Sequence, residues 1–209
     1  MGELEHEMTD DPPTPLARLR AGNERFLDAI AASPNPEAAV GALSEADPYA
    51  IVLGCSDSRV PPELVFDEAI GRLFVIRVAA NLAGNAEIAA MEFAIARWSC
   101  PLVVVLGHTQ CGAVAAAMET PPPGTDLPAD PSGSTHLPTL LGLIRANLGW
   151  TGLEPGADPW RRAVRANVRR TIDQLLWSMP LRGRLDAGQL AIVGAVYDVE
   201  TGEVEFLGG

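Results

Sequence analysis

The chain has 209 residues, of which 47% are hydrophobic, so it is long enough to form one globular domain with its own core. Its 27 acidic and 15 basic residues give a net charge of −12, which disfavours binding to nucleic acids and to anionic membrane surfaces. All the basic residues are Arg, and the lack of Lys excludes lysine Schiff-base chemistry and a Walker-type phosphate loop.

Acidic residues dominate the N-terminal end of the chain. We expect residues 1–13 to form a flexible acidic segment and residues 14–209 to form a single domain. The acidic segment contains no Arg, unlike a secretory or organellar leader. No uninterrupted apolar run approaches the roughly 20 residues that span a bilayer. These features predict a cytoplasmic protein.

Residues 14–48 are predicted to form a helical arm at the start of the domain. Thr14 is suited to cap a helix, and Pro15 is suited to its first position. Apolar residues then recur at helical spacing, namely Leu16, Leu19, Phe26, Leu27 and Ile30. The pattern predicts an amphipathic helix over residues 14–32.

Short apolar runs alternate with helical patterns through the rest of the chain. The runs typical of buried parallel strands lie at residues 49–54, 73–77, 102–106 and 190–198. The helical patterns lie at residues 86–98, 137–148 and 160–179. A Pro-rich stretch at residues 120–136 predicts a surface loop, and residues 204–207 are expected to form an antiparallel edge strand after a tight turn. This order predicts an α/β fold, with a mainly parallel four-stranded sheet, an antiparallel edge strand and flanking helices.

The three cysteines are an odd number, which favours metal binding or thiol catalysis over a disulfide framework. Cys55 follows the first predicted strand and His108 follows the third, so both should lie at the carboxyl edge of the sheet, where such folds bind ligands. Cys111 comes three residues after His108 at an expected helix start, which would place both side chains on one helical face. Two thiolates and an imidazole can hold zinc with a fourth position open, as in catalytic zinc sites. Cys100 is interpreted as a core residue.

His-x-x-Cys alone is weak support for a metal site, because cysteines are often simply buried hydrophobic residues. The segment from Cys55 to Arg59 adds an acid and a base, Asp57 and Arg59, spaced two residues apart. Such a pair can be an ordinary surface salt bridge, but its place beside the expected metal ligands favours a functional role.

Three motifs together resemble the β-class carbonic anhydrases: CSDSRVPPELVF at 55–66, LFVIRVAAN at 73–81 and GHTQCGA at 107–113. The similarity extends from a pattern at 19–26 to the Gly-x-x-Tyr-Asp run at 194–198. It implies Zn²⁺ held by Cys55, His108 and Cys111, and a catalytic pair of Asp57 and Arg59. It also implies substrate contacts from three residues, Val60, Asn81 and Gly112.

The activity that the resemblance implies is the reversible hydration of carbon dioxide to bicarbonate and a proton, by attack of zinc-bound hydroxide. The family also implies a homodimer or homotetramer with active sites at a dimer interface and N-terminal helices that embrace the partner subunit. Two thiolates neutralise the zinc, so its bound water should be harder to deprotonate than with three imidazoles, and activity should favour alkaline pH. In a closed, inactive state, Asp57 can swing in as a fourth ligand.

The chain departs from the family pattern at several places. A Gln-x-Pro whose Gln resembles a substrate hydrogen-bond donor is replaced by residues 46–48 (ADP), and the usual Ala-Gly-Asn becomes residues 79–81 (AAN). Some members anchor a regulatory bicarbonate pocket with a Trp where this chain has Val52, which favours a site open at rest. The alternatives are a hydrolase of carbonyl sulfide or carbon disulfide, a non-catalytic zinc-binding protein that is structural or sensing, and a thiol redox protein.

Overall fold

The computed structural model describes residues 14–35, 46–119, 136–149 and 158–208. The chain divides into two units, Met1–Glu45 and Ala46–Gly209, and each is described by itself. The predicted acidic segment 1–13 and all of the predicted Pro-rich loop except His136 lie outside the described residues.

The first unit contains one described helix, α1 (Pro15–Ala31). The Thr14 side chain caps it by accepting a hydrogen bond from the Ala17 N–H at 3.2 Å, and Pro15 occupies its first turn as predicted. Taken by itself, α1 buries none of its residues. Its large apolar side chains are therefore available to pack against another surface.

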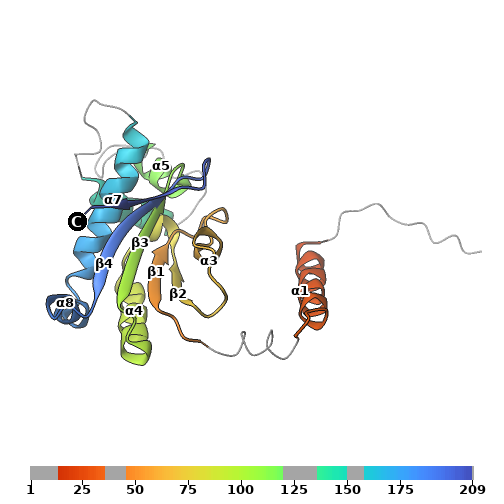
Figure 1. Ribbon diagram of the computed structural model, residues 1–209. Helices are drawn as coiled ribbons and strands as arrows, with labels where there is room; N and C mark the ends of the chain where they lie inside the picture. Colours follow the sequence, from red (N-terminus) through yellow and green to blue (C-terminus); the bar gives the residue numbers. More distant parts are fainter. Residues whose placement is uncertain (1–13, 36–45, 120–135, 150–157, 209) are drawn as a thin grey trace, which may run out of the picture. The chain divides into compact units, whose positions relative to one another are not determined.

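The second unit is built on a five-stranded sheet in the order β2-β1-β3-β4-β5 (Figure 1). The strands are β1 (Ala50–Gly54), β2 (Leu73–Arg77), β3 (Leu102–His108), β4 (Ala191–Tyr197) and β5 (Val204–Leu207). The first four are parallel, and β5 pairs antiparallel with β4. Gly202, at φ +78°, provides the left-handed residue of the connecting turn. The predicted α/β fold with four parallel strands and an antiparallel edge strand is confirmed.

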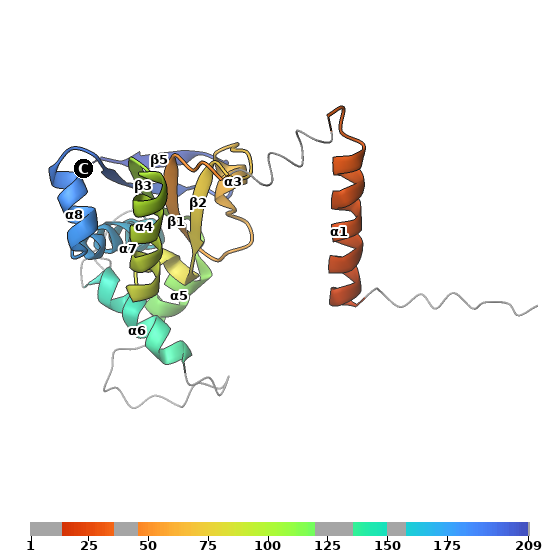
Figure 2. The same ribbon diagram turned by 90° about the horizontal axis from the view of Figure 1, so that it is seen from below.

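The connections between the parallel strands contain helices. They comprise α3 (Pro62–Val65), the 3-10 turn η1 (Ala79–Asn81), α4 (Asn85–Trp98), α5 (Gly112–Glu119), α6 (Leu137–Leu148), α7 (Pro159–Leu175) and α8 (Met179–Asp186). The helices α5, α6 and α7 contact one another and lie side by side in Figure 2. No helix among the described residues is long and apolar enough to cross a membrane, and the cytoplasmic location stays a prediction.

The single helix predicted over residues 160–179 is wrong, because the structure has two. The first, α7, ends at Leu175, and Ser178 caps α8 by accepting from the Leu181 N–H at 3.3 Å. Pro180 lies in the first turn of α8, where its missing N–H does no harm, but it could not continue α7. Apolar residues on both sides of the break obscure it in the sequence pattern.

The two faces of the sheet differ in how they are covered. Side chains alternate between faces along each strand, and Leu53 and Val105 belong to the main core with residues of α4, α5, α6 and α7. Val52 and Val104 belong to a smaller cluster, which includes Phe66 after α3. Most of the helical packing, and hence most of the hydrophobic stabilisation, lies on one face.

Two glycines on neighbouring strands let α7 approach the sheet closely. A Cβ added at Gly107 would lie 2.7 Å from Val168 Cγ2 and 3.0 Å from Val164 Cγ1. One added at Gly194 would lie 2.8 Å from Val168 Cγ1. Val168 therefore fills the space that both glycines leave, which fixes the distance of α7 from β3 and β4.

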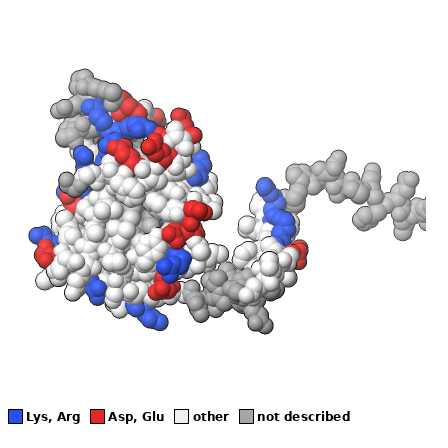
Figure 3. All heavy atoms as spheres, viewed as in Figure 1, with Lys and Arg blue, Asp and Glu red and all other residues white. Residues whose placement is uncertain are grey.

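Ion pairs attach α7 to the β4–β5 hairpin. Arg161 pairs with Asp198, and Arg165 pairs with Glu205. Figure 3, viewed as in Figure 1, shows basic and acidic side chains gathered together at the top of this unit, where α7 begins. Partly exposed pairs of this kind contribute little stability individually, but they fix where the hairpin lies.

Replacing Gly107 with Ala is expected to lower the free energy of unfolding by about 1 to 3 kcal/mol, because the new methyl group overpacks against Val164 and Val168. Chemical denaturation followed by circular dichroism measures the change. Adding Val168→Ala to this variant should recover part of the loss. As a control, Gly183→Ala on α8 places a methyl group where no atom lies within 4 Å, and it should be neutral or stabilising. Equal losses from the two glycine variants would contradict the close packing of α7.

Candidate metal centre

Three buried side chains, Cys55, His108 and Cys111, meet at the carboxyl edge of the sheet. Their potential ligand atoms all lie within 4.8 Å of one another. Cys55 follows β1 directly and His108 is the last residue of β3, so two neighbouring parallel strands bring them to the same edge. Cys111 directly precedes α5. The predicted meeting of the three side chains is confirmed.

The expectation that His108 and Cys111 share a helical face is wrong. The strand β3 continues through His108 because that residue pairs with Tyr197 of β4. A turn follows, in which Gln110 adopts a left-handed φ of +57°, and it brings Cys111 back beside His108. The Cys111 sulfur accepts hydrogen bonds from the Ala113 and Val114 N–H groups at the start of α5. Cys111 therefore lies against the start of α5, whereas His108 lies outside the helix.

The hydrogen bonding of His108 leaves one ring nitrogen free to bind a metal. Its side chain is 1% exposed, and Nδ1 lies 2.9 Å from the Thr109 carbonyl oxygen. A carbonyl can only accept, so Nδ1 carries the proton and Nε2 presents a lone pair. Among the described residues, Nε2 makes no hydrogen bond of ordinary geometry, although His108 lies close enough to Cys55 to lower the pKa of that thiol. A buried acceptor without a donor is the state expected of a metal ligand.

The two thiols share a proton. Their sulfurs lie 3.9 Å apart, too far for a disulfide. The hydrogen bond from the Cys111 thiol lowers the pKa of Cys55 to about 4, and the same bond raises the pKa of Cys111 far above its ordinary value. One thiolate thus forms readily, whereas the second needs a positive charge beside it.

The geometry of the three donors suits zinc. Two sulfurs bound to one tetrahedral zinc at about 2.3 Å each would lie about 3.8 Å apart, which agrees with the observed separation. Two thiolates and one neutral imidazole also match the soft and borderline ligands that zinc prefers. The residues present therefore fit this metal, with three protein ligands.

Asp57 and Arg59 form a bidentate ion pair beside the cluster. Arg59 donates from Nε to Asp57 Oδ1 at 3.0 Å and from Nη2 to Oδ2 at 2.8 Å. These hydrogen bonds hold the pKa of Asp57 well below its usual range. Asp57 Oδ2 also lies 4.0 Å from His108 Nε2, so the carboxylate reaches towards the metal-binding atoms. Its side chain is 19% exposed, against 47% for Arg59.

Two further residues position this pair; both lie within the quoted motifs, but no role was predicted for either. Arg77, the last residue of β2, donates to the carbonyl oxygens of Cys55 (3.0 Å) and Asp57, which fixes the loop that carries both. The main-chain carbonyl oxygen of Gln110 accepts a hydrogen bond from Arg59 Nη2 at 3.1 Å, and the side-chain Nε2 of Gln110 donates to Glu200 at 2.6 Å. The sequence signal for Arg77 was a charged residue at the end of an apolar strand, at the carboxyl edge of the sheet.

The structure places the remaining predicted residues differently. Val60 is buried in the core, and Asn81 is 2% exposed, with a side-chain nitrogen that lacks a partner among the described residues. Gly112 is exposed at the start of α5. Their role in substrate binding stays a prediction. Cys100 is fully buried, and its sulfur donates to the Pro48 carbonyl rather than joining the cluster.

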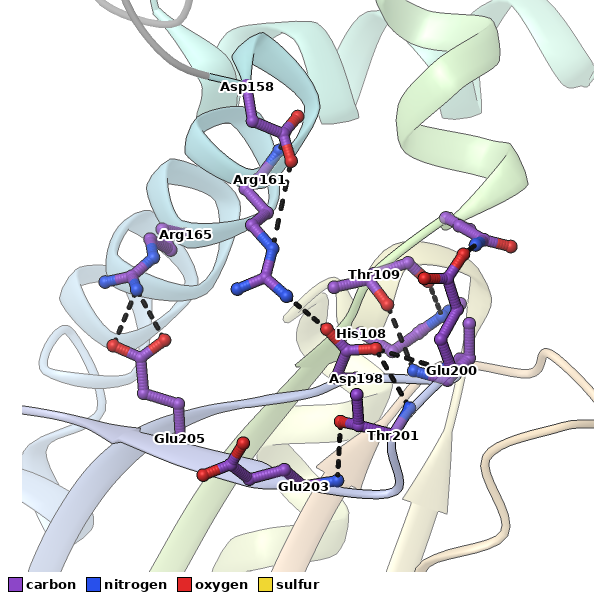
Figure 4. Close-up of polar contacts among 12 residues, drawn as sticks. His108, Thr109, Asp158, Arg161, Arg165, Asp198, Glu200, Thr201, Glu203 and Glu205 are labelled. Atoms are coloured by element: carbon purple, nitrogen blue, oxygen red, sulfur yellow. Dashed lines mark hydrogen bonds and ion pairs between the residues drawn. The ribbon is translucent and has the colours of Figure 1, made fainter.

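The turn after β3 is joined to the β4–β5 hairpin. Thr109 Oγ1 accepts from the Val199 N–H at 3.0 Å, and Asp198 Oδ1 accepts from the Glu200 N–H at 2.9 Å. Figure 4 shows Arg161 of α7 reaching Asp198, with His108 and Thr109 behind it. These contacts fix the segment that follows His108 from the side of β4.

Comparison with known proteins gives this arrangement a family. A family model for carbonic anhydrase matches residues 50–204, which contain the whole donor cluster. The solved structure of the β-carbonic anhydrase CcaA is 27% identical, with a TM-score of 0.74 over 93% of this chain and 92% of that one. The chain belongs to the β class of carbonic anhydrases. Enzymes of this family interconvert carbon dioxide and bicarbonate.

Curated relatives extend the similarity over nearly the full chain. Carbonic anhydrase 2 of Mycobacterium tuberculosis is 31% identical over 92% of this chain and 91% of its own length. A carbonic anhydrase of Mycolicibacterium smegmatis is 33% identical over 93% of both chains. A Coccomyxa β-carbonic anhydrase solved with acetazolamide shares the fold, with a TM-score of 0.74 and 24% identity over 93% of this chain and 87% of that one.

The shared proton predicts how many protons zinc releases when it binds. Near pH 7 the metal-free pair should hold one thiolate and one thiol, so binding should release close to one proton from the sulfurs. Two thiols with ordinary pKa values near 8.5 would release nearly two. Titration calorimetry in buffers of different ionisation enthalpy counts the protons. A value near two would contradict the shared proton.

Proposed function

We propose that this β-carbonic anhydrase hydrates carbon dioxide with a zinc ion held by Cys55 Sγ, His108 Nε2 and Cys111 Sγ. The observation that carries the proposal is the buried Nε2 lone pair, which lies with the two sulfurs and has no hydrogen-bond donor among the described residues. Bound there, zinc would acidify a water molecule and so supply the nucleophile, an effect for which carbonic anhydrases are the standard example.

Asp57 orients the reacting group by accepting a hydrogen bond from it. As a carboxylate throughout the neutral and alkaline range, Asp57 can only accept a hydrogen bond, and Oδ2 faces the space beside His108 Nε2. A proton-bearing oxygen held there would donate a hydrogen bond to Oδ2, so its lone pair would point away from Asp57. Arg59 keeps the carboxylate in this orientation through its two parallel hydrogen bonds.

The same carboxylate can close the site. The 4.0 Å between Asp57 Oδ2 and His108 Nε2 is short enough for a modest side-chain movement to bring Oδ2 to the metal as a fourth ligand. In the structure Asp57 is paired with Arg59, which corresponds to the open arrangement. Arg59 therefore opposes closure, because closure would break its bidentate contact with Asp57.

Asp57→Asn is expected to lower kcat for carbon dioxide hydration by about 100-fold, because the amide keeps the volume but loses the charge that Arg59 orients. Stopped-flow hydration with a pH indicator measures kcat, and metal analysis should show unchanged zinc content. Asp47→Asn is the matched control, since Asp47 also pairs with an Arg, at 3.1 Å, but on the exposed surface. Full activity in the Asp57 variant would contradict the catalytic role, and a wild-type protein without zinc would contradict the metal site.

We further propose that α1 packs on a partner subunit in a homodimer or homotetramer. Four of its large apolar side chains are exposed in its own unit, namely Leu16, Leu19, Phe26 and Leu27. An amphipathic helix of this kind gains stability only when another surface covers its apolar side. The solved structures of two tetrameric β-carbonic anhydrases from the ascomycete Sordaria macrospora support assembly of this kind, and a chain from that work shares the fold with a TM-score of 0.73.

The double variant Leu19→Glu, Leu27→Glu should shift the protein to a smaller assembly, because buried carboxylates in the interface would be unpaired. Light scattering after gel filtration measures the mass. Arg25→Glu, on the polar side of α1, should leave the mass unchanged. An unchanged mass in the double variant would contradict a role of α1 in assembly.

A further inference from the structure

Asn167 is a buried polar residue in the middle of α7 that no sequence motif identified. Its side chain is 1% exposed. The amide nitrogen donates to the Ala80 carbonyl oxygen at 2.7 Å, and the amide oxygen accepts from Asn147 of α6 at 3.0 Å. Asn167 therefore joins helix packing to the turn η1, which lies 87 residues earlier in the chain.

Ala80 holds an unfavourable backbone conformation at this turn. Its φ of +56° and ψ of +28° are left-handed, which costs a non-glycine residue about 1 to 2 kcal/mol. Asn81 follows with φ +45°. Such a conformation persists only where neighbouring groups hold it, and the hydrogen bond from Asn167 is one that does so.

The strained peptide points at the metal centre. The Val78 N–H, directly before η1, donates to the Gly54 carbonyl oxygen at 3.1 Å, which holds the turn against the residue before Cys55. The N–H groups of Ala80 and Asp57 face the Cys55 sulfur and lower the pKa of that thiol. The carbonyl of Ala80 is held by Asn167 and its N–H is directed at Cys55, so the orientation of this residue is fixed from both sides. A rotation of the turn would move the N–H away from the sulfur.

The orientation of Asn167 is itself fixed by a chain of amides. Gln174 Nε2 donates to Asn147 Oδ1 at 2.9 Å, and Asn147 Nδ2 donates to Asn167 Oδ1. Reversal of the Asn167 amide would place two donors together at Asn147 and two acceptors together at Ala80. The approach of α7 to Gly107, the residue before His108, brings this amide within reach of the turn.

We infer that Asn167 is a positioning residue for the metal centre, which holds the Ala80 peptide so that its N–H is directed at the Cys55 sulfur. The inference rests on the proposed zinc site. It assigns to α7 a task beyond core packing, because removing the Asn167 donor would release the turn beside the first sulfur ligand. Residues that orient metal ligands in this way usually contribute 10- to 100-fold to metal affinity.

The test compares Asn167→Asp with Thr171→Val. The Asp variant keeps the volume and the acceptor for Asn147 but loses the donor to Ala80. Thr171 is fully buried one turn further along α7, and its hydroxyl lies 3.5 Å from Asn147 Nδ2, so its variant perturbs the same helix packing without touching the turn. Zinc affinity is measured by competition with a chromophoric chelator, at a temperature where circular dichroism shows each protein folded.

We expect Asn167→Asp to weaken zinc binding by about 10- to 100-fold and Thr171→Val to change it by less than about twofold. With cobalt in place of zinc, the thiolate-to-metal absorption band should shift or weaken only in the Asn167 variant. Asn167→Ala is the second variant if the buried carboxylate prevents folding. Zinc affinity equal to that of the wild-type protein in a folded Asn167 variant would overturn this inference but not the proposed function. Failure of both Asn167 variants to fold would have the same consequence. Failure of the wild-type protein to bind zinc would instead overturn the proposed function.

Discussion

Two sulfur atoms held 3.9 Å apart in buried surroundings impose the electrostatic constraint on which the rest of the structure depends. Burial disfavours each thiolate, and each thiolate disfavours the other, so both can be charged only when a cation lies between them. The fold reduces this cost with peptide N–H groups, which reach Cys55 from Asp57 and Ala80 and reach Cys111 from the start of α5. These dipoles carry no net charge, so a divalent ion remains the natural complement.

Core packing and ligand geometry rely on the same helix. Val168 of α7 fills the space left by Gly107 and Gly194, and that contact fixes how far α7 lies from the sheet. One residue away, Asn167 meets the turn whose N–H is directed at Cys55. A change in packing at Gly107 or Gly194 would therefore displace the groups around the Cys55 sulfur, because close-packed interiors transmit small displacements.

Exposure changes across the site in a way that suits the reaction. The three donor side chains are buried, Asp57 is 19% exposed and Arg59 is 47% exposed. Carbon dioxide is apolar, whereas bicarbonate and the proton are charged and must return to water. With zinc bound as proposed, a buried metal-binding side next to an exposed ion pair would allow the substrate to meet the nucleophile away from bulk solvent and would let the products leave towards it.

The sequence by itself determined the α/β fold, the parallel strands and the set of donor residues, because apolar periodicity and residue chemistry are local properties. It was wrong about the break between α7 and α8 and about a shared helical face for His108 and Cys111. Only the tertiary structure decided the left-handed conformation of Ala80 and the contact with Asn167. That contact joins residues 87 positions apart, and the packing of α7 on the sheet, which no local pattern encodes, brings them together.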